Sequence, residues 1–209
     1  MTIFCINIGD LSYGQYSLPI IKKLCEYNNI NLFVLDKNIP QNIFRVHPSW
    51  LKLFCHQIVK DDFIISWDLD LVPTRMYNIK EMFDTNKINL SYDGSYLKEN
   101  FTFNGKFKYN CGLLGIPKNK QEWCENIYHS SNHRKYPSYE QYHINDSIYD
   151  NKININLLDN RLNKMYDARP IDSNDSNYNI HYTWKTGGNE HKRELIEKHC
   201  RIFANTLGI

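Results

Sequence analysis

The sequence predicts a single α/β domain in which a mostly parallel central sheet is flanked by helices. Short apolar runs alternate with stretches whose apolar residues recur every three or four positions, and this alternation is typical of parallel sheets. The 209 residues suffice for one sizeable core, and 42% hydrophobic and 14% aromatic residues argue against disorder. No internal repeat or linker divides the chain, so we expect one domain over residues 1–209.

The first part of the chain predicts three buried strands separated by two helices. Apolar runs at residues 3–8, 30–35 and 63–67 give the strands. Pro19 suits the first turn of the first helix, where its missing N–H costs nothing. The apolar positions at helical spacing are Leu18, Ile21, Leu24 and Cys25 in the first helix, and Trp50, Leu53, Phe54 and Ile58 in the second.

The second part of the chain is less regular. It predicts strands at residues 88–92, 113–116 and 180–182, a half-exposed strand with Ile153, Ile155 and Leu157, and helices at residues 120–130, 139–149 and 190–204. One face of the last helix carries Leu195, Ile196, His199 and Phe203.

The bulk properties exclude several classes of partner. A net charge of +2 provides no strong field to attract nucleic acid or anionic lipid. Residues 1–6 lack the features of a signal peptide, and no run approaches the roughly 18 apolar residues of a membrane span. We therefore expect a cytoplasmic protein, in the host cytoplasm if the gene is viral. The six cysteines include no CxxC pair, which favours buried reduced thiols.

Two aspartates directly follow the third apolar run. Asp68 and Asp70 are separated by one residue, so on an extended chain their carboxylates share a face, with Cα atoms roughly 6–7 Å apart. Two like charges this close repel unless a cation lies between them, and oxygen ligands suit a divalent ion. In open parallel sheets, ligands bind beyond the carboxyl ends of strands. The alternative is that the two residues merely begin a solvated loop.

Four later segments add to this pair. They are Tyr109-Asn110-Cys111-Gly112, Glu140-Gln141 through Asn145, Arg161-Leu162-Asn163, and Ile180-His181-Tyr182 through Lys185 to Gly188. Together with Asp68-Leu-Asp70, and in the same order, they resemble the motifs of the Rossmann-like GT-A glycosyltransferases. The likeness is to the retaining type typified by glycogenin and bacterial lipooligosaccharide galactosyltransferases, and to the glycosyltransferase domains that chlorella viruses encode.

The resemblance implies a metal-dependent transfer of a sugar from a nucleotide-sugar donor to an acceptor hydroxyl on a glycan or glycoprotein. It favours a UDP-hexose such as UDP-glucose, a retaining outcome, and Mn²⁺ as the cofactor, with Mg²⁺ as the alternative. It implies metal ligation by Asp68, Asp70 and His181. Mn²⁺ is favoured over Mg²⁺ because an imidazole beside carboxylates suits manganese better than magnesium. Residues 1–75 would form the nucleotide-binding half, and residues 76–209 the sugar and acceptor half.

The same resemblance implies the remaining site residues. Asp68, Asp70, Glu140 and Gln141 are the expected catalytic residues. The donor is expected to contact Asn7, Gly9, Asp10, Tyr16, Lys52, Asp93, Asn110, Gly112, Lys185 and Gly188. Simpler interpretations stay open for several of them: His181 as a structural histidine, Lys52 as a solvated lysine, and Gly187-Gly188 as an ordinary turn.

The chain also departs from the family pattern. Glu140 stands where the family has Asp, and Cys111 where it has Ala. The closing segment lacks the Gly-x-x-Lys-Pro-Trp form, and the chain is short for the group, so a further domain could supply an acceptor region. These differences leave the stereochemistry and the acceptor open. An inverting enzyme would need a carboxylate base, for which Glu140, Asp93 and Asp146 are candidates.

Two other functions fit parts of the sequence. A sugar nucleotidyltransferase also uses metal-bound carboxylates on an α/β sheet, but it normally carries a Gly-rich loop with Lys or Arg after its first strand, and residues 9–14 contain neither. A non-catalytic carbohydrate-binding module would use some of the 15 tyrosines and 4 tryptophans as faces for sugar stacking.

Overall fold

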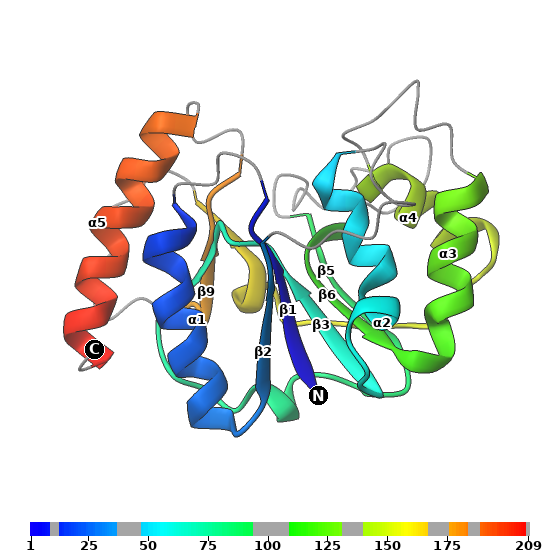
Figure 1. Ribbon diagram of the computed structural model, residues 1–209, viewed down its shortest axis with the longest axis horizontal. Coiled ribbons are helices and arrows are strands. Elements are labelled where there is room, and N and C mark those ends of the chain that lie inside the picture. Colours follow the sequence, from blue (N-terminus) through cyan, green and yellow to red (C-terminus); the bar gives the residue numbers. More distant parts are fainter. Residues whose placement is uncertain are drawn as a thin grey trace.

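The computed structural model describes residues 1–8, 13–36, 47–93, 109–130, 140–166, 176–183 and 189–207. Its centre is a six-stranded sheet of order β2-β1-β3-β6-β5-β7 (Figure 1). The strands are β1 Thr2–Ile6, β2 Asn31–Leu35, β3 Phe63–Trp67, β5 Ile88–Tyr92, β6 Tyr109–Pro117 and β7 Ile155–Leu157. β6 runs antiparallel to both of its neighbours, and the other neighbouring pairs are parallel. The predicted α/β fold with a mostly parallel sheet is therefore confirmed.

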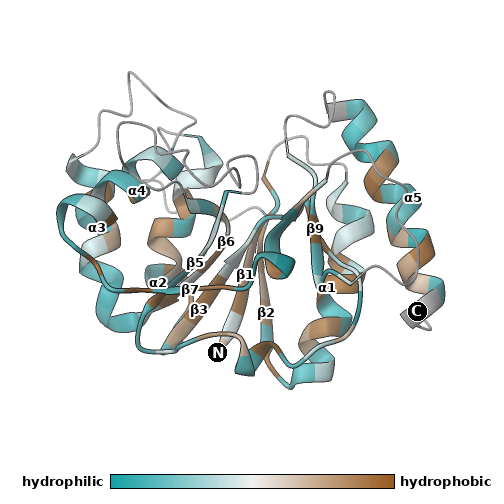
Figure 2. Ribbon diagram, turned by 180° about the vertical axis from the view of Figure 1, so that it is seen from behind, coloured by the Kyte–Doolittle hydropathy of each residue, from teal (hydrophilic) through white to brown (hydrophobic). Residues whose placement is uncertain are grey.

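Helices cover both faces of this sheet (Figure 1). α1 (Gly14–Asn28) and α5 (Asn189–Leu207) lie on one side; a 3₁₀ helix (Pro48–Phe54), α2 (Cys55–Ile58), α3 (Gln121–Ser130) and α4 (Glu140–Asp150) lie on the other. Neighbouring strand residues point into separate cores: Ile65 packs on the α1 side and Ile64 on the α3 side. Burial on both faces explains the continuous apolar runs of the strands. In Figure 2 the central strands are mostly brown, whereas the helices carry much teal.

A second, smaller sheet, which the sequence patterns do not predict, has the order β4-β9-β8. Its strands are β4 (Leu71–Pro73), β8 (Lys164–Met165) and β9 (Asn179–His181). β4 follows Asp70 directly and pairs antiparallel with β9, so that Leu71 lies opposite His181. This pairing brings the chain near residue 181 to the carboxyl end of β3.

Several details of the sequence prediction are wrong. Pro19 lies inside α1 and not in its first turn, because Gly14 and Ser17 are small buried residues that extend the buried face one turn upstream. Pro19 has no N–H to donate to the carbonyl of Gln15, four residues earlier in the helix. Both residues are exposed, so water can donate to this carbonyl instead. β1 ends at Ile6 and not at residue 8.

The second predicted helix is mostly a 3₁₀ helix, followed by the single turn of α2. Residues 50–54 are all buried, so this segment is enclosed on every side and has no one-sided stripe. β6 begins at Tyr109, earlier than the predicted residue 113. The apolar pattern missed the first part of this strand because it contains the polar residue Asn110 and the small residue Gly112.

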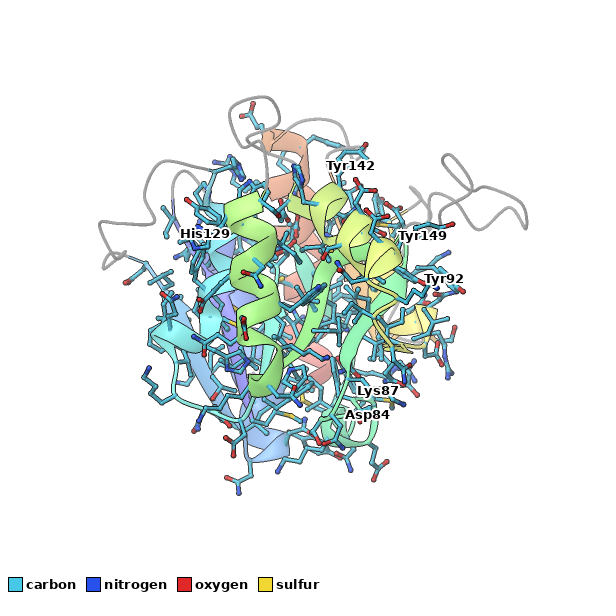
Figure 3. All side chains as sticks on the ribbon, turned by 90° about the vertical axis from the view of Figure 1, so that its right-hand side faces the viewer. Asp84, Lys87, Tyr92, His129, Tyr142 and Tyr149 are labelled. Atoms are coloured by element: carbon cyan, nitrogen blue, oxygen red, sulfur yellow. The ribbon has the colours of Figure 1, made fainter. Side chains whose placement is uncertain are left out.

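The prediction of buried reduced cysteines is confirmed. All six cysteines are buried free thiols. Among the helices that the structure describes, none is long and apolar enough to cross a membrane. Tyr142 and Tyr149 are exposed on α4, and Tyr92 ends β5 and stacks on Tyr109 at 5.8 Å between ring centroids (Figure 3).

Candidate functional site

Asp68 and Asp70 lie at the carboxyl end of β3, as predicted. The backbone on both sides of the pair is fixed: the N–H of Asp68 donates to the carbonyl of Gly112, and the N–H of Leu71 donates to the carbonyl of Asp68, each at 2.9 Å. The N–H of Tyr182, directly after β9, donates to the carbonyl of Asp70 at 2.9 Å. The two carboxylates are thus presented by a short turn that joins the large sheet to the small one.

His181 completes a group of three possible metal ligands. One ligand atom each from Asp68, Asp70 and His181 can be chosen so that all three lie within 4.8 Å of one another. Nε2 of His181 is 3.3 Å from Oδ1 of Asp70. The ring is buried, and its position follows from the pairing of β4 with β9.

A chain of amide contacts orients the His181 ring. Nδ2 of Asn163 donates to Oγ of Ser91 at 2.7 Å and to Oδ1 of Asn110 at 2.8 Å. Since this amide nitrogen is the donor to both, Oδ1 of Asn163 is an acceptor, and it lies 2.8 Å from Nδ1 of His181. Nδ1 then carries a hydrogen, and Nε2 is the ring nitrogen that faces a carboxylate oxygen of Asp70. A ring oriented through Nδ1 offers Nε2 as a ligand, so the donor set of one imidazole and two carboxylates fits a divalent metal.

Asp68 and Asp70 have different electrostatic surroundings. Burial by itself raises the pKa of the Asp70 carboxyl, but His181 and Lys192 outweigh burial and hold this pKa well below its usual range. Burial also raises the pKa of Asp68; Lys52 opposes this effect and the charge of Asp70 adds to it. Asp70 is therefore firmly ionised, and the repulsion predicted between the two carboxylates is present.

Lys52 is a buried cation behind Asp68. Its Nζ lies 3.2 Å from Oδ1 of Asp68, 3.1 Å from Oε1 of Glu140 and 3.0 Å from the carbonyl of Cys111. The side chain is 1% exposed, which rules out the alternative of a solvated lysine. Oε2 of Glu140 accepts a hydrogen bond of 2.6 Å from the hydroxyl of Ser49, so both oxygens of this carboxylate are engaged.

Gln141 and Asp93 join the same region. Oε1 of Gln141 accepts from the N–H of Cys111 at 2.9 Å, and its Nε2 donates to Oδ2 of Asp93 at 3.4 Å. Oδ1 of Asn110 accepts from the N–H of Gly112 at 2.8 Å. Five of the predicted site residues, Asp93, Asn110, Gly112, Glu140 and Gln141, are therefore brought together beside the carboxylate pair.

Solved structures with this arrangement of elements include three glycosyltransferases. A glycosyltransferase involved in glycosylation of the major capsid of PBCV-1 aligns with a TM-score of 0.68 at 13% identity, over 95% of this chain and 100% of its own. GlyE of Streptococcus pneumoniae TIGR4 aligns at 0.64 and 15% identity, over 99% of this chain but only 62% of its own. The galactosyltransferase LgtC, solved with donor and acceptor sugar analogues, aligns at 0.53 and 17% identity, over 95% and 96%.

The chain has a GT-A-like fold. The expected resemblance to GT-A glycosyltransferases is thus confirmed in structure. No protein-family model and no curated protein matches the sequence. Identities of 13–17% establish a shared fold, and the activity has to be argued from the site itself.

Within the GT-A-like fold, the predicted nucleotide side is described only in part. The N–H of Asn7 donates to the carbonyl of Leu35 at 2.8 Å, which extends the pairing of β1 with β2. The Glu197 carboxylate of α5 raises the pKa of the Tyr16 hydroxyl, so this ring lies beside α5. The predicted residues Gly9, Asp10, Lys185 and Gly188 lie outside the described residues.

The sequence patterns did not predict Lys192 as a site residue. It lies on α5, its side chain is 11% exposed, and its ammonium group forms an ion pair with Oδ2 of Asp70. A signal was present in the sequence: Lys192 precedes Ile196 by four residues and therefore shares the buried stripe of this helix with His199 and Phe203. A lysine at such a position requires a buried partner.

Gly112 is required by the position of His181. A Cβ on residue 112 would lie 2.4 Å from Cε1 of His181 and 3.0 Å from its Nδ1. We expect Gly112→Ala to displace the imidazole and to weaken Mn²⁺ binding, measured by isothermal titration calorimetry, by about 10–100-fold, the usual effect of losing the support of a metal ligand.

Gly115→Ala is the matched control for this variant. Its Cβ would also clash, at 2.8 Å with Phe63 and 2.9 Å with Phe83, but in the apolar core. Gly115→Ala should lower stability and leave the Mn²⁺ affinity of the folded protein unchanged. Equal Mn²⁺ affinity in both variants would contradict ligation by His181.

Proposed function

We propose that this protein is a metal-dependent glycosyltransferase that moves a hexose from a UDP-sugar to an acceptor hydroxyl. The observation that carries the proposal is the group of Asp68, Asp70 and the Nε2 of His181 at the carboxyl end of β3, in a GT-A-like fold. Two carboxylates and an imidazole favour Mn²⁺ over Mg²⁺, with Mg²⁺ as the alternative. When bound, the ion would act as a Lewis acid on the diphosphate leaving group.

The site residues of this chain then have separate roles in holding the ion and the sugar. Asp68, Asp70 and His181 hold the ion, and the buried charge of Lys52 holds Asp68 in place. Asp93, Asn110 and Gln141 offer amide and carboxylate groups to sugar hydroxyls. We propose with it a nucleotide-binding half over about residues 1–75 and a sugar and acceptor half over about residues 76–209, which also supplies His181 to the metal site.

The retaining outcome is part of the proposal. An inverting transfer needs a carboxylate base beside the acceptor, and Glu140 is a poor candidate because Lys52 and Ser49 engage both of its oxygens. Gln141, which lies next to it and reaches Asp93, is neutral and fits a contact to the donor sugar. NMR of the anomeric configuration of the product distinguishes the two outcomes directly.

We propose a glycan or a glycoprotein as the acceptor. Tyr142 and Tyr149 on α4 are 44% and 55% exposed, and Tyr142 directly follows Gln141, so aromatic faces for sugar stacking lie near the proposed sugar side. Transfer of a labelled sugar to glycans, and not to unglycosylated peptides, would support this class of acceptor.

A thermal-shift screen tests the function. A ligand at one hundred times its Kd adds about 2.7 kcal/mol of stability, or roughly 5–10 °C in Tm for a domain of this size. We expect UDP with Mn²⁺ to raise the Tm by such an amount, and ADP, GDP or Mn²⁺ alone to raise it less. Pyrophosphate release from a nucleoside triphosphate and a sugar phosphate would favour a nucleotidyltransferase instead. Stabilisation by glycans alone, with no response to any nucleotide, would favour a binding module.

A further inference from the structure

Lys192 is a buried cation whose charge is directed at the proposed metal site. Its ammonium group contacts Oδ2 of Asp70, while Oδ1 of the same carboxylate faces Nε2 of His181 at 3.3 Å. The ring of Tyr13 also lies beside the ammonium group, with its centroid 5.0 Å from Nζ. In this arrangement both oxygens of Asp70 already have a partner that is positively charged or can become so.

The backbone of Lys192 is held in place, so that its side chain is the part able to move. On the same face of α5, Ile196, Cys200 and Phe203 are buried in the core. Nδ1 of His199 is hydrogen-bonded to the hydroxyl of Tyr182, directly after β9. The lysine side chain itself has several rotatable bonds and can turn its ammonium group without moving the helix.

A divalent ion held by Asp68, Asp70 and His181 would share Asp70 with this ammonium group. Two cations on one carboxylate repel each other, and the buried setting screens that repulsion poorly. The ammonium group must then give up part of its ion pair, which is costly for a charge as buried as this one. A diphosphate bound to the ion changes the balance, because it brings new negative oxygens to which an ammonium group can turn.

We propose that Lys192 is an internal counter-cation of Asp70 that couples the binding of the metal ion to the binding of the nucleotide diphosphate. The ion alone binds weakly because it competes with Lys192. The ion and the diphosphate together bind tightly because the lysine exchanges Asp70 for phosphate oxygens. This inference rests on the proposed function, since it requires that the site takes both an ion and a diphosphate.

Titration calorimetry with Mn²⁺ and UDP measures the coupling. The Kd of Mn²⁺ is determined with and without saturating UDP, and by linkage the ratio of the two values is the coupling factor. For the unaltered protein we expect a factor of about 10 or more, within the usual range for coupled sites. Lys192→Met should bind Mn²⁺ alone about 10-fold more tightly, and its coupling factor should fall to roughly 1–3.

Two further variants separate the charge of Lys192 from its packing. Lys192→Gln keeps a hydrogen-bond donor beside Asp70 without the charge and should behave like Lys192→Met, so the test stands even if Met disturbs α5. Lys198→Met changes an exposed lysine of the same helix and should leave both Kd values unchanged.

The outcomes distinguish this inference from the function on which it rests. An unaltered protein that binds neither Mn²⁺ nor UDP overturns the proposed function and the inference together. If both ligands bind but Lys192→Met and Lys192→Gln keep the original Mn²⁺ affinity and coupling factor, the inference alone is overturned and Lys192 is a structural ion pair that joins α5 to the turn before β4.

Discussion

Asp70→Asn is expected to abolish metal-dependent cleavage of the donor, lowering kcat/KM by about 10³-fold or more. The change keeps the shape of the side chain but removes the charge that faces both His181 and Lys192. Without that charge an ion loses a carboxylate ligand and meets an unopposed ammonium group. The measurement is the release of UDP from a UDP-sugar at saturating Mn²⁺, together with the Mn²⁺ affinity from calorimetry.

Asp62→Asn is the matched control, because Asp62 precedes β3 at the opposite end of the strand and its side chain is 97% exposed. Its activity and Mn²⁺ affinity should equal those of the unaltered protein. Asp70→Asn also leaves Lys192 without its carboxylate, so circular dichroism has to show that the variant is folded. Full activity in a folded Asp70→Asn protein with unchanged Mn²⁺ binding would refute the role of this residue.

Lys52→Met is expected to have the largest effect on stability. Burial alone would lower the pKa of Lys52, but Asp68 and Glu140 raise it above its usual value, so the ammonium ion is bound tightly in the folded protein. Removing it leaves two acidic groups near each other and Glu140 buried without its counter-charge. Breaking a buried pair in this way costs about 3–5 kcal/mol, which lowers the Tm by roughly 6–20 °C.

The control for this variant is Lys118→Met. Lys118 faces Asp62 at 3.9 Å in an ion pair whose side chains are 67% and 97% exposed, so its loss should not change the Tm measurably. Glu140→Gln combined with Lys52→Met should recover part of the lost stability, since the double variant no longer leaves Glu140 charged. A Tm of Lys52→Met equal to that of the unaltered protein would contradict the buried ion cluster.

Local patterns were sufficient to predict the carboxylate pair. Asp68 and Asp70 follow an apolar run directly, so their common face and their place at a strand end depend on neighbouring residues alone. The same holds for β3 and β5, whose observed bounds equal the predicted ones. The position of His181 depends on the pairing of β4 with β9, which joins segments far apart in the chain and has no local signal. Its place beside the aspartates was inferred from the family resemblance.

The partners of the buried lysines were beyond the reach of sequence patterns. Lys52 stands between Leu51 and Leu53, and Lys192 lies on an apolar stripe, so burial could have been suspected for both. Which carboxylate each lysine meets is decided by the packing of the 3₁₀ helix and of α5 against opposite sides of the turn at residues 68–70. Periodicity does not contain that information.

Crystals grown with Mn²⁺ and UDP, with anomalous diffraction measured at the manganese edge, test the central claim most directly. We predict one manganese peak at the turn after β3, coordinated by Asp68, Asp70, Nε2 of His181 and oxygens of the diphosphate, with the ammonium group of Lys192 turned from Asp70 towards phosphate. A manganese peak elsewhere, or a bound nucleotide with Asp68 and Asp70 directed away from any ion, would contradict it.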